Sequence, residues 1–216
     1  MSLLSFKSID LKNIQGVILD LDNTLYEYEP CHKRALFNVF NAFSGIFPCT
    51  YDEFTCLYKE AQDSVKSRTS NQAASHSRLL YFQHMIEKCS GKTLFEKTLV
   101  FEGLYWETFI DAMEIDPAAA QFLVDCKKNS IKVCIITDLT SEIQFKKILK
   151  LGIEDKVSFM VTSEEAGVEK PDPRIFEYTL NKIKLTKSEV IVIGDNKIKD
   201  IDGAEKLGIK AYLVRG

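Results

Sequence analysis

The stretch Val17-Ile18-Leu19-Asp20-Leu21-Asp22-Asn23-Thr24 joins a short apolar run to two carboxylates one residue apart. An apolar run of this length, rich in branched residues and ended by polar ones, is typical of a buried strand. The two acidic side chains would then lie where the strand stops. Paired carboxylates can bind a divalent hard cation, and a carboxylate beside such a cation can act as a nucleophile. On its own the stretch fits an acidic turn equally well.

The composition is that of a soluble globular protein, with 45% hydrophobic and 27% charged residues and a net charge of -3 over 216 residues. Lysines and arginines are scattered, which argues against a nucleic acid polymer as the main partner. No segment has the ~18 apolar residues of a membrane span, and Met1 to Gln15 lacks the apolar core of a signal peptide. The six cysteines are widely spaced and suit reduced thiols. We expect a cytoplasmic protein with no membrane partner, and a monomer and a homodimer stay equally open.

Residues 26–105 show helical periodicity throughout and no alternation of period two. Thr50 and Glu53 form a capping box at the start of one helix, and Gly91 is placed to end another. The small residues between Ser67 and Ser77 predict a loop. We interpret residues 26–105 as a helical insertion.

From Asp116 onward the pattern alternates between helix and strand, with Asp116-Pro117 and Asp172-Pro173 as two helix starts. Apolar strands that alternate with helices predict a parallel sheet covered on both faces. The expected fold is α/β, a Rossmann-like doubly wound parallel sheet built from residues 1–25 and 106–216. Beyond the first strand, the expected strands are Val133–Ile136, Val157–Val161, Val190–Ile193 and Ala211–Val214.

Polar side chains follow the predicted strands at the edge where an open parallel sheet binds its ligands. They are Asp20 and Asp22 after the first strand, Thr137 and Asp138 after the second, Lys170 ahead of the fourth, and Asp195, Asn196 and Asp200 after it.

Each of these residue types has a role in phosphoryl transfer. Asp20 and Asp195 can supply the carboxylates that Mg²⁺ prefers, and Lys170 with Thr137 can compensate the charge of a phosphate. Asp22 is the candidate to protonate a leaving alkoxide. Taken singly, Lys170 suits a solvated surface lysine, Thr137 a strand end, and Asp200 a helix N-cap. Their joint placement at successive strand ends favours a site.

In this order the residues resemble the four motifs of the haloacid dehalogenase superfamily of phosphohydrolases. The motifs correspond to Asp20-Leu21-Asp22-Asn23-Thr24, then Thr137, then Lys170-Pro171, then Gly194-Asp195 with Asp200. With the sheet pattern, the resemblance covers the whole chain. The insertion at 26–105 is similar to the first cap type (C1) of that superfamily, which closes over the substrate and would determine specificity.

The resemblance implies a Mg²⁺-dependent phosphomonoesterase. Asp20 would attack phosphorus to form an aspartyl-phosphate, and Asp22 would protonate the leaving oxygen and later activate water. Mg²⁺ would be held by the Asp20 carboxylate, the Asp22 backbone carbonyl and Asp195. Thr137 and Lys170 would hold the phosphate. The residues expected behind or beside the phosphate are Asp138, Asn196 and Asp200.

The segment from Ser163 to Phe176 is most similar to phosphatases of small molecules, including phosphoglycolate, nucleotide and acylneuraminate phosphatases. The expected substrate is therefore a small phosphorylated metabolite such as phosphoglycolate, a sugar phosphate or a nucleotide. Three cationic side chains of the insertion are candidates for holding the rest of that substrate: His32, Arg34 and Arg78.

Asp138 departs from the family pattern, in which asparagine usually follows the motif hydroxyl. A carboxylate ~4 Å from a phosphate oxygen would cost on the order of 1 to 4 kcal/mol. Asp138 therefore turns away, contacts another part of the substrate, or weakens activity.

Three other functions stay open. A 2-haloacid dehalogenase shares the fold and nucleophile, but such enzymes lack the second aspartate of the first motif, so Asp22 argues against it. A phosphotransferase of the sugar phosphomutase kind needs the same core and differs in how water is excluded. A degenerate, non-catalytic phosphate-binding member of the superfamily is the third.

Overall fold

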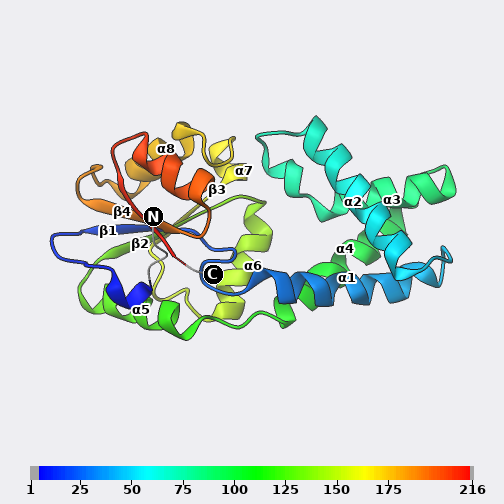
Figure 1. Ribbon diagram of the computed structural model, residues 1–216, viewed down its shortest axis with the longest axis horizontal. Coiled ribbons are helices and arrows are strands. Elements are labelled where there is room, and N and C mark those ends of the chain that lie inside the picture. The colour runs from blue at the N-terminus through cyan, green and yellow to red at the C-terminus, as the bar shows by residue number, and fades with distance from the viewer. Residues whose placement is uncertain (1–4, 215–216) are drawn as a thin grey trace.

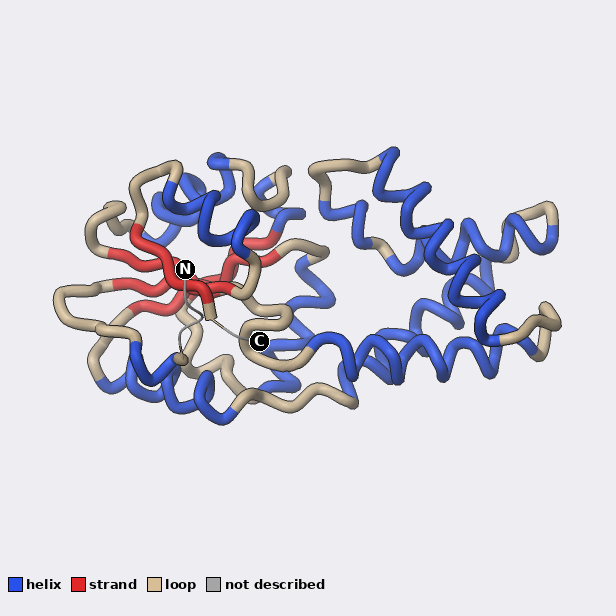
Figure 2. Tube along the Cα trace, in the orientation of Figure 1, coloured by secondary structure: helices blue, strands red, loops and turns tan. Residues whose placement is uncertain are grey.

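The computed structural model describes residues 5–214, so the first four and last two residues of the predicted core lie outside it. Five parallel strands form one sheet in the order β3-β2-β1-β4-β5. Helices cover both faces of the sheet, and a separate group of helices extends from one end of it (Figures 1 and 2). The predicted α/β doubly wound fold is confirmed. The strands are β1 (Gly16–Leu19), β2 (Lys132–Thr137), β3 (Phe159–Thr162), β4 (Val190–Gly194) and β5 (Lys210–Leu213).

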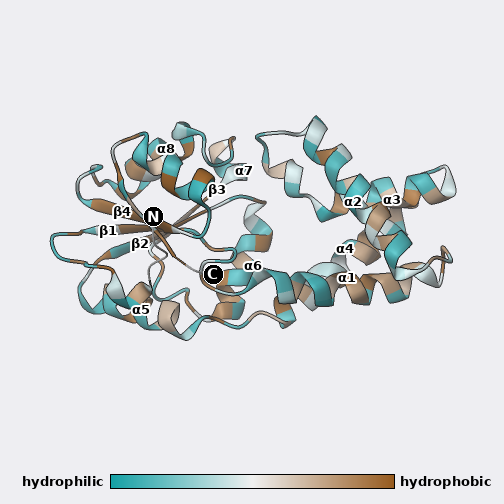
Figure 3. Ribbon diagram, in the orientation of Figure 1, coloured by the Kyte–Doolittle hydropathy of each residue, from teal (hydrophilic) through white to brown (hydrophobic). Residues whose placement is uncertain are grey.

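Alternation along β1 separates the two faces of the sheet. Val17 and Leu19 belong to one buried cluster with residues of α5 (Pro117–Lys128) and α6 (Ser141–Leu151). Ile18 belongs to a second cluster with residues of α8 (Pro173–Ile183). The strands are accordingly apolar along their length, and the helices show polar surfaces outward (Figure 3). The helical elements of this part are η1 (Phe6–Ser8), α5 (Pro117–Lys128), α6 (Ser141–Leu151), α7 (Ser163–Ala166), α8 (Pro173–Ile183), η3 (Lys197–Asp202) and α9 (Gly203–Glu205).

The helices that extend from the sheet form the segment we call the cap. They are α1 (Tyr28–Ser44), α2 (Tyr51–Arg68), η2 (Ala73–His76), α3 (Arg78–Ser90) and α4 (Phe95–Asp111). Thr50 and Glu53 form the predicted capping box of α2, and Gly91 ends α3 with a left-handed backbone (φ 70°). The predicted boundary at residue 105 falls inside α4, one unbroken helix, so the division into core 1–25 and 106–216 and cap 26–105 stays a prediction.

Three local predictions differ from the structure. β3 begins at Phe159 rather than Val157, because the Val157 amide bonds the Ile153 carbonyl in the preceding turn (3.2 Å). The predicted loop from Ser67 to Ser77 contains the last residues of α2 and the short helix η2. The helix after β4 starts as the π-helical turn η3, in which Asn196 caps the free amides. None of the described helices combines the length and apolarity needed to cross a bilayer.

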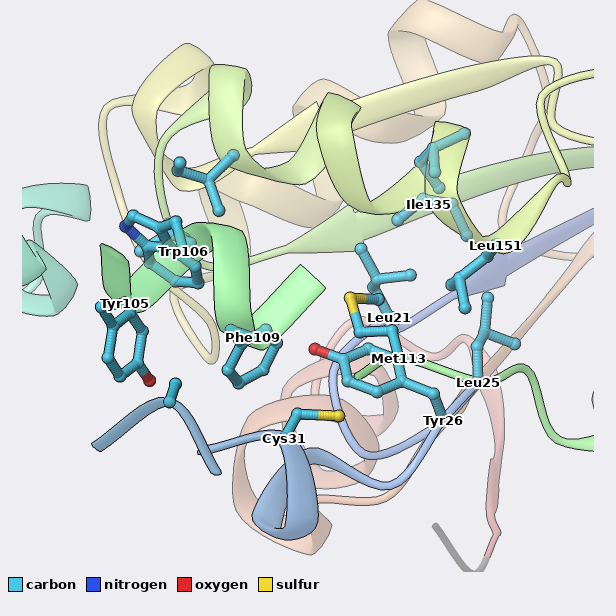
Figure 4. Packing of buried hydrophobic residues seen from close by; sticks show 14 of the residues in the cluster. Leu21, Leu25, Tyr26, Cys31, Tyr105, Trp106, Phe109, Met113, Ile135 and Leu151 are labelled. Atoms are coloured by element: carbon cyan, nitrogen blue, oxygen red, sulfur yellow. The ribbon is translucent and has the colours of Figure 1, made fainter. Parts of the chain in front are cut away.

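One buried apolar cluster continues from the sheet into the cap (Figure 4). Leu21 and Leu25 contribute to it from the loop after β1, Ile135 from β2, and Trp106 and Phe109 from α4. The cap is therefore anchored to the sheet by shared packing as well as by the chain connections.

Replacing Phe109, which is fully buried in this cluster, with alanine should lower the free energy of unfolding by about 3–5 kcal/mol. The cavity left behind cannot collapse without moving α4. Chemical denaturation measures the change. Phe95→Ala, in the same helix but 77% exposed, is the control and should change stability by less than about 0.5 kcal/mol.

Candidate active site

The strand order reverses between β1 and β4, and the carboxyl ends of these two strands open into a cavity of about 530 Å³. The predicted motif residues line it from the sheet side, and side chains of α1, α2, η2, α3 and α4 line it from the cap side. The motif residues that line the cavity are Asp20, Asp22, Thr137, Asp138, Lys170, Asp195, Asn196 and Asp200.

The Lys170 ammonium lies between two carboxylates at the base of the cavity. Its Nζ donates to Asp20 Oδ1 (2.5 Å) and to Asp200 Oδ1 (2.7 Å), and all three side chains are at most 8% exposed. Burial alone would lower the pKa of Lys170, but Asp20 and Asp200 outweigh it and raise that pKa well above its usual range. Lys170 is therefore charged, and it fixes the position of Asp20.

Asp200 is not an N-cap, the structural role that its position left open. Its Oδ2 accepts from the backbone amide of Asn196 (3.0 Å), while Oδ1 faces Lys170. Asn196 is the N-cap residue of η3: its Oδ1 accepts from the amides of Ile198 and Lys199 (both 3.0 Å).

Three carboxylates converge where a cation would bind. Asp20, Asp195 and Asp200 each present an oxygen, and these oxygens lie within 4.8 Å of one another. Burial raises the pKa of Asp20 to about 8, with Lys170 opposing and Asp200 adding to the rise. Burial, and Asp200 in addition, also raises the pKa of Asp195, although Asn23 opposes this. With all three carboxylates ionised, their negative charge would exceed the positive charge of Lys170 by two, so an oxygen-binding divalent cation such as Mg²⁺ fits the donor set.

Asn23 and Thr24 orient these carboxylates from the turn after β1. Thr24 Oγ1 donates to Asp20 Oδ2 (2.8 Å), and Asn23 Nδ2 donates to Asp195 Oδ2 (2.9 Å). Asn23 adopts a left-handed backbone (φ 64°), a conformation that asparagine tolerates better than most residues. The turn therefore links the end of β1 to the end of β4.

Asp22 is held by three donors. Lys147 Nζ donates to its Oδ1 (2.6 Å), Gln144 Nε2 to its Oδ2 (3.2 Å), and the Tyr26 hydroxyl also to Oδ1. Burial raises the pKa of Asp22, but Lys147 and the hydrogen bonds outweigh burial, and the pKa is lowered overall. Asp22 is thus an ionised carboxylate.

Lys147 and Gln144 are absent from the sequence prediction. Both are fully buried and lie on the inner face of α6, three residues apart. Ile143, Lys147 and Leu151 are spaced by four, so a lysine in the middle of an apolar stripe was the available signal. The Lys147 ammonium also lies 5.5 Å and 5.3 Å from the ring centres of Trp106 and Phe109 in the cap.

Asp138 turns its carboxylate toward the protein. Its Oδ1 accepts from the backbone amide of Lys170 (3.1 Å), and its Oδ2 accepts from Lys199 Nζ (2.6 Å). Lys199 compensates the negative charge that departs from the family pattern. Thr137 Oγ1 accepts from Gln144 Nε2 (2.6 Å), which orients the hydroxyl.

The structure brings two of the three substrate candidates to the cavity. His32 and Arg78 line it, whereas Arg34 is exposed on the far side of α1, 3.7 Å from Asp111. Residues two apart on a helix face opposite sides, which is why His32 and Arg34 separate.

A segment of the cap that includes η2 contacts the loop that carries Lys170. Ser75 Oγ donates to Glu169 Oε1 (2.6 Å), and Asn71 Oδ1 accepts from the Glu169 amide (3.1 Å). His76 Nε2 also lies 3.1 Å from Glu169 Oε1. The cap therefore contacts the residue directly before Lys170.

Comparison with known proteins identifies the family. Residues 14–208 match the haloacid dehalogenase-like hydrolase family. This chain belongs to that family. It is 32% identical to the ribulose-1,5-bisphosphate 5-phosphatase of Halopiger xanaduensis over 92% of this chain and 83% of the relative. It is 31% identical to the phosphoserine phosphatase of Thermus thermophilus over 92% of this chain and 87% of the relative. The fold also matches a HAD phosphatase structure from Thermococcus onnurineus (TM-score 0.71, 22% identity, 94% of this chain and 86% of the other).

Gly194 is required by the position of Asp200. A methyl group at residue 194 would overlap the Asp200 carboxylate, which is held by Lys170 and Asn196. Gly194→Ala should lower the free energy of unfolding by about 1–3 kcal/mol and reduce phosphatase activity. Gly103→Ala, in α4 with open space around it, is the control and should be neutral or stabilising by up to about 1 kcal/mol. An unchanged Gly194→Ala protein would contradict the geometry around Lys170.

The Asp22–Lys147 pair should show a strong energetic coupling. Lys147→Met leaves a largely buried carboxylate unpaired, and Asp22→Asn should relieve that cost, giving a coupling of about 1–3 kcal/mol in a double-mutant cycle on unfolding. The exposed Glu142–Lys146 pair of the same helix, replaced by glutamine and methionine, is the control and should couple by about 0.5 kcal/mol or less. Equal couplings would refute a specific role for Lys147.

Proposed function

We propose that this chain is a Mg²⁺-dependent phosphomonoesterase that hydrolyses a small phosphorylated metabolite through an aspartyl-phosphate on Asp20. The observation that carries the proposal is the Asp20 carboxylate, held by Lys170 and Thr24 at the end of β1 with the oxygens of Asp195 and Asp200 close by. Family membership and two relatives named as phosphatases support the activity.

In the first half-reaction, Asp20 attacks phosphorus and the bond to the substrate oxygen breaks. Lys170 and the Thr137 hydroxyl lie in the same cavity as Asp20 and can compensate the charge of the transferring group. A bound Mg²⁺ would supply further charge compensation, with Asp20, Asp195 and the backbone of Asp22 as its protein ligands. The leaving oxygen takes up a proton, and Asp22 is the nearest candidate donor in the motif.

In the second half-reaction, water attacks the phosphorus of the phosphorylated Asp20 and the carboxylate is released. A base must remove a proton from that water, and ionised Asp22 is ready for this step. To carry a proton in the first half-reaction, Asp22 must first loosen its contact with Lys147. Lys147 therefore sets the balance between the two roles of Asp22.

Two observations favour a phosphatase over a dehalogenase and over a degenerate member of the family. A dehalogenase attacks carbon and requires neither a metal nor a proton for a leaving alkoxide, so it would have no need for Asp22. The Lys199 ammonium neutralises the charge of the Asp138 carboxylate. That charge was the sequence feature that suggested a non-catalytic member of the family. The named relatives act on a sugar bisphosphate and on an amino-acid phosphate, so they do not select one substrate.

Asp20→Asn should remove at least about 10³-fold of the turnover of p-nitrophenyl phosphate while the protein stays folded, because an amide cannot act as the nucleophile. Chelation of divalent cations should abolish wild-type turnover, and Mg²⁺ should restore it. Release of inorganic phosphate is the measurement, since it distinguishes hydrolysis from transfer to another hydroxyl.

Asp111→Asn, an exposed aspartate outside the cavity, is the matched control and should leave turnover unchanged. Substantial activity in Asp20→Asn, or activity that persists under chelation, would exclude the proposed mechanism.

A further inference from the structure

Arg78 is a buried cation on the cap side of the cavity, at the first position of α3. It is only 6% exposed, and its guanidinium lies 5.2 to 5.5 Å from the ring centres of Tyr81, Tyr105 and Trp106. An arginine side chain stays charged under all physiological conditions. A buried charge is costly unless it is paired, so the absence of an oppositely charged partner among residues 5–214 requires an explanation.

The hydrogen bonds of Arg78 leave most of its donors unused. Nη1 donates to the carbonyl of His76 (2.6 Å) and Nη2 donates to the Tyr28 hydroxyl. Both acceptors are neutral, and the buried Nε has no partner among residues 5–214. Within the same range, no carboxylate forms an ion pair with Arg78. Each of the two Nη atoms therefore has one N–H group without an acceptor in the described part of the chain.

The positive charge of Arg78 helps to lower the pKa of two neighbouring side chains. The pKa of Lys66, which lines the same cavity, is lowered by burial and then by Arg78. The pKa of His32 is lowered to about 4, again by burial first and Arg78 second. His32 is thus neutral at pH 7, and Lys66 has no ion-pair partner in the described part of the chain. Glu29 lines the cavity too, but it lies 3.4 Å from Lys33.

The two halves of the cavity differ in charge. The sheet side gathers Asp20, Asp195 and Asp200 around Lys170, which suits a metal ion and the phosphoryl group. The cap side presents Arg78 and Lys66 with neutral hydrogen-bonding rings, and the carboxylate of Glu29 there lies near Lys33. A ligand that spans the cavity therefore meets a second, separate anion-binding position.

We propose that Arg78, assisted by Lys66, binds a second oxyanion of the substrate, either a carboxylate or a second phosphate, remote from the phosphoryl group that is cleaved. This inference rests on the proposed function, because it assumes that the cleaved phosphate lies at Asp20. The planar fork of Arg78 matches both kinds of oxyanion in a bidentate manner. The substrate class is then a phosphomonoester with an anionic tail.

Two matched ligand pairs test the proposal. 3-Phosphoglycerate differs from glycerol 3-phosphate by one carboxylate, and ribulose 1,5-bisphosphate differs from ribulose 5-phosphate by one phosphate. Isothermal titration of the full-length Asp20→Asn protein with each ligand, in the presence of Mg²⁺, reports binding without turnover. In at least one pair, the ligand with the second oxyanion should bind at least tenfold more tightly than the ligand without it. That pair identifies whether the oxyanion is a carboxylate or a phosphate.

Arg78→Met in the same background should reduce this preference to less than threefold, and Arg78→Lys should leave an intermediate preference because it keeps a charge but loses the fork. Arg68→Met, an exposed arginine of the cap outside the cavity, is the matched control and should keep the full preference. If Arg78 only supports the cap through its aromatic contacts, Arg78→Met will lower the melting temperature and leave the preference intact.

Equal affinities within both pairs, or a preference that survives Arg78→Met or Arg78→Lys unchanged, would overturn the inference. Turnover separates this failure from failure of the proposed function. If the wild-type protein hydrolyses p-nitrophenyl phosphate and the binding preference is absent, only the second oxyanion site is contradicted. If hydrolytic activity is absent and the Arg78-dependent binding preference is present, only the proposed function is contradicted.

Discussion

The buried ammonium of Lys170 is the interaction on which the site depends, because it holds together segments that are far apart in the sequence. Asp20 ends β1, Asp200 lies in the helix after β4, and Lys170 comes from the loop ahead of α8. Removing Lys170 would leave two carboxylates without their counter-ion in a nearly water-free position, which is a costly state. The same ion pairs position Asp20, the proposed nucleophile, and the carboxylates around them suit a divalent cation.

The second buried pair, Asp22 with Lys147, connects the chemistry to the cap. Lys147 contacts Asp22 on one side and faces the rings of Trp106 and Phe109 on the other. These rings belong to the apolar cluster that continues from the sheet into the cap. A movement of α4 would therefore alter the surroundings of Lys147, and through it the proton affinity of Asp22. The cap could thereby influence the proposed acid–base step at Asp22.

The sequence predicted the sheet and most of the site because parallel strands bring their carboxyl ends to one edge, so strand position alone places Asp20, Thr137 and Asp195 together. It did not predict contacts that depend on packing between distant elements. From the sequence, Lys147 is one residue of an amphipathic helix, and its contact with Asp22 follows only from the packing of α6. The partner of Asp138, Lys199, likewise comes from a distant element, the helix after β4. Helical periodicity alone separates His32 from Arg34, because residues two apart on a helix face opposite sides.

The central claim is that Asp20 is the group to which phosphorus becomes bonded. A crystal structure of the protein with Mg²⁺ and orthovanadate, which mimics the transferring phosphoryl group, tests it most directly. The account predicts vanadium bonded to a carboxylate oxygen of Asp20, with Lys170 and Thr137 in contact with the vanadate oxygens and the cation bound to Asp20 and Asp195. Vanadate bound away from Asp20, or a cation bound at other residues, would contradict it.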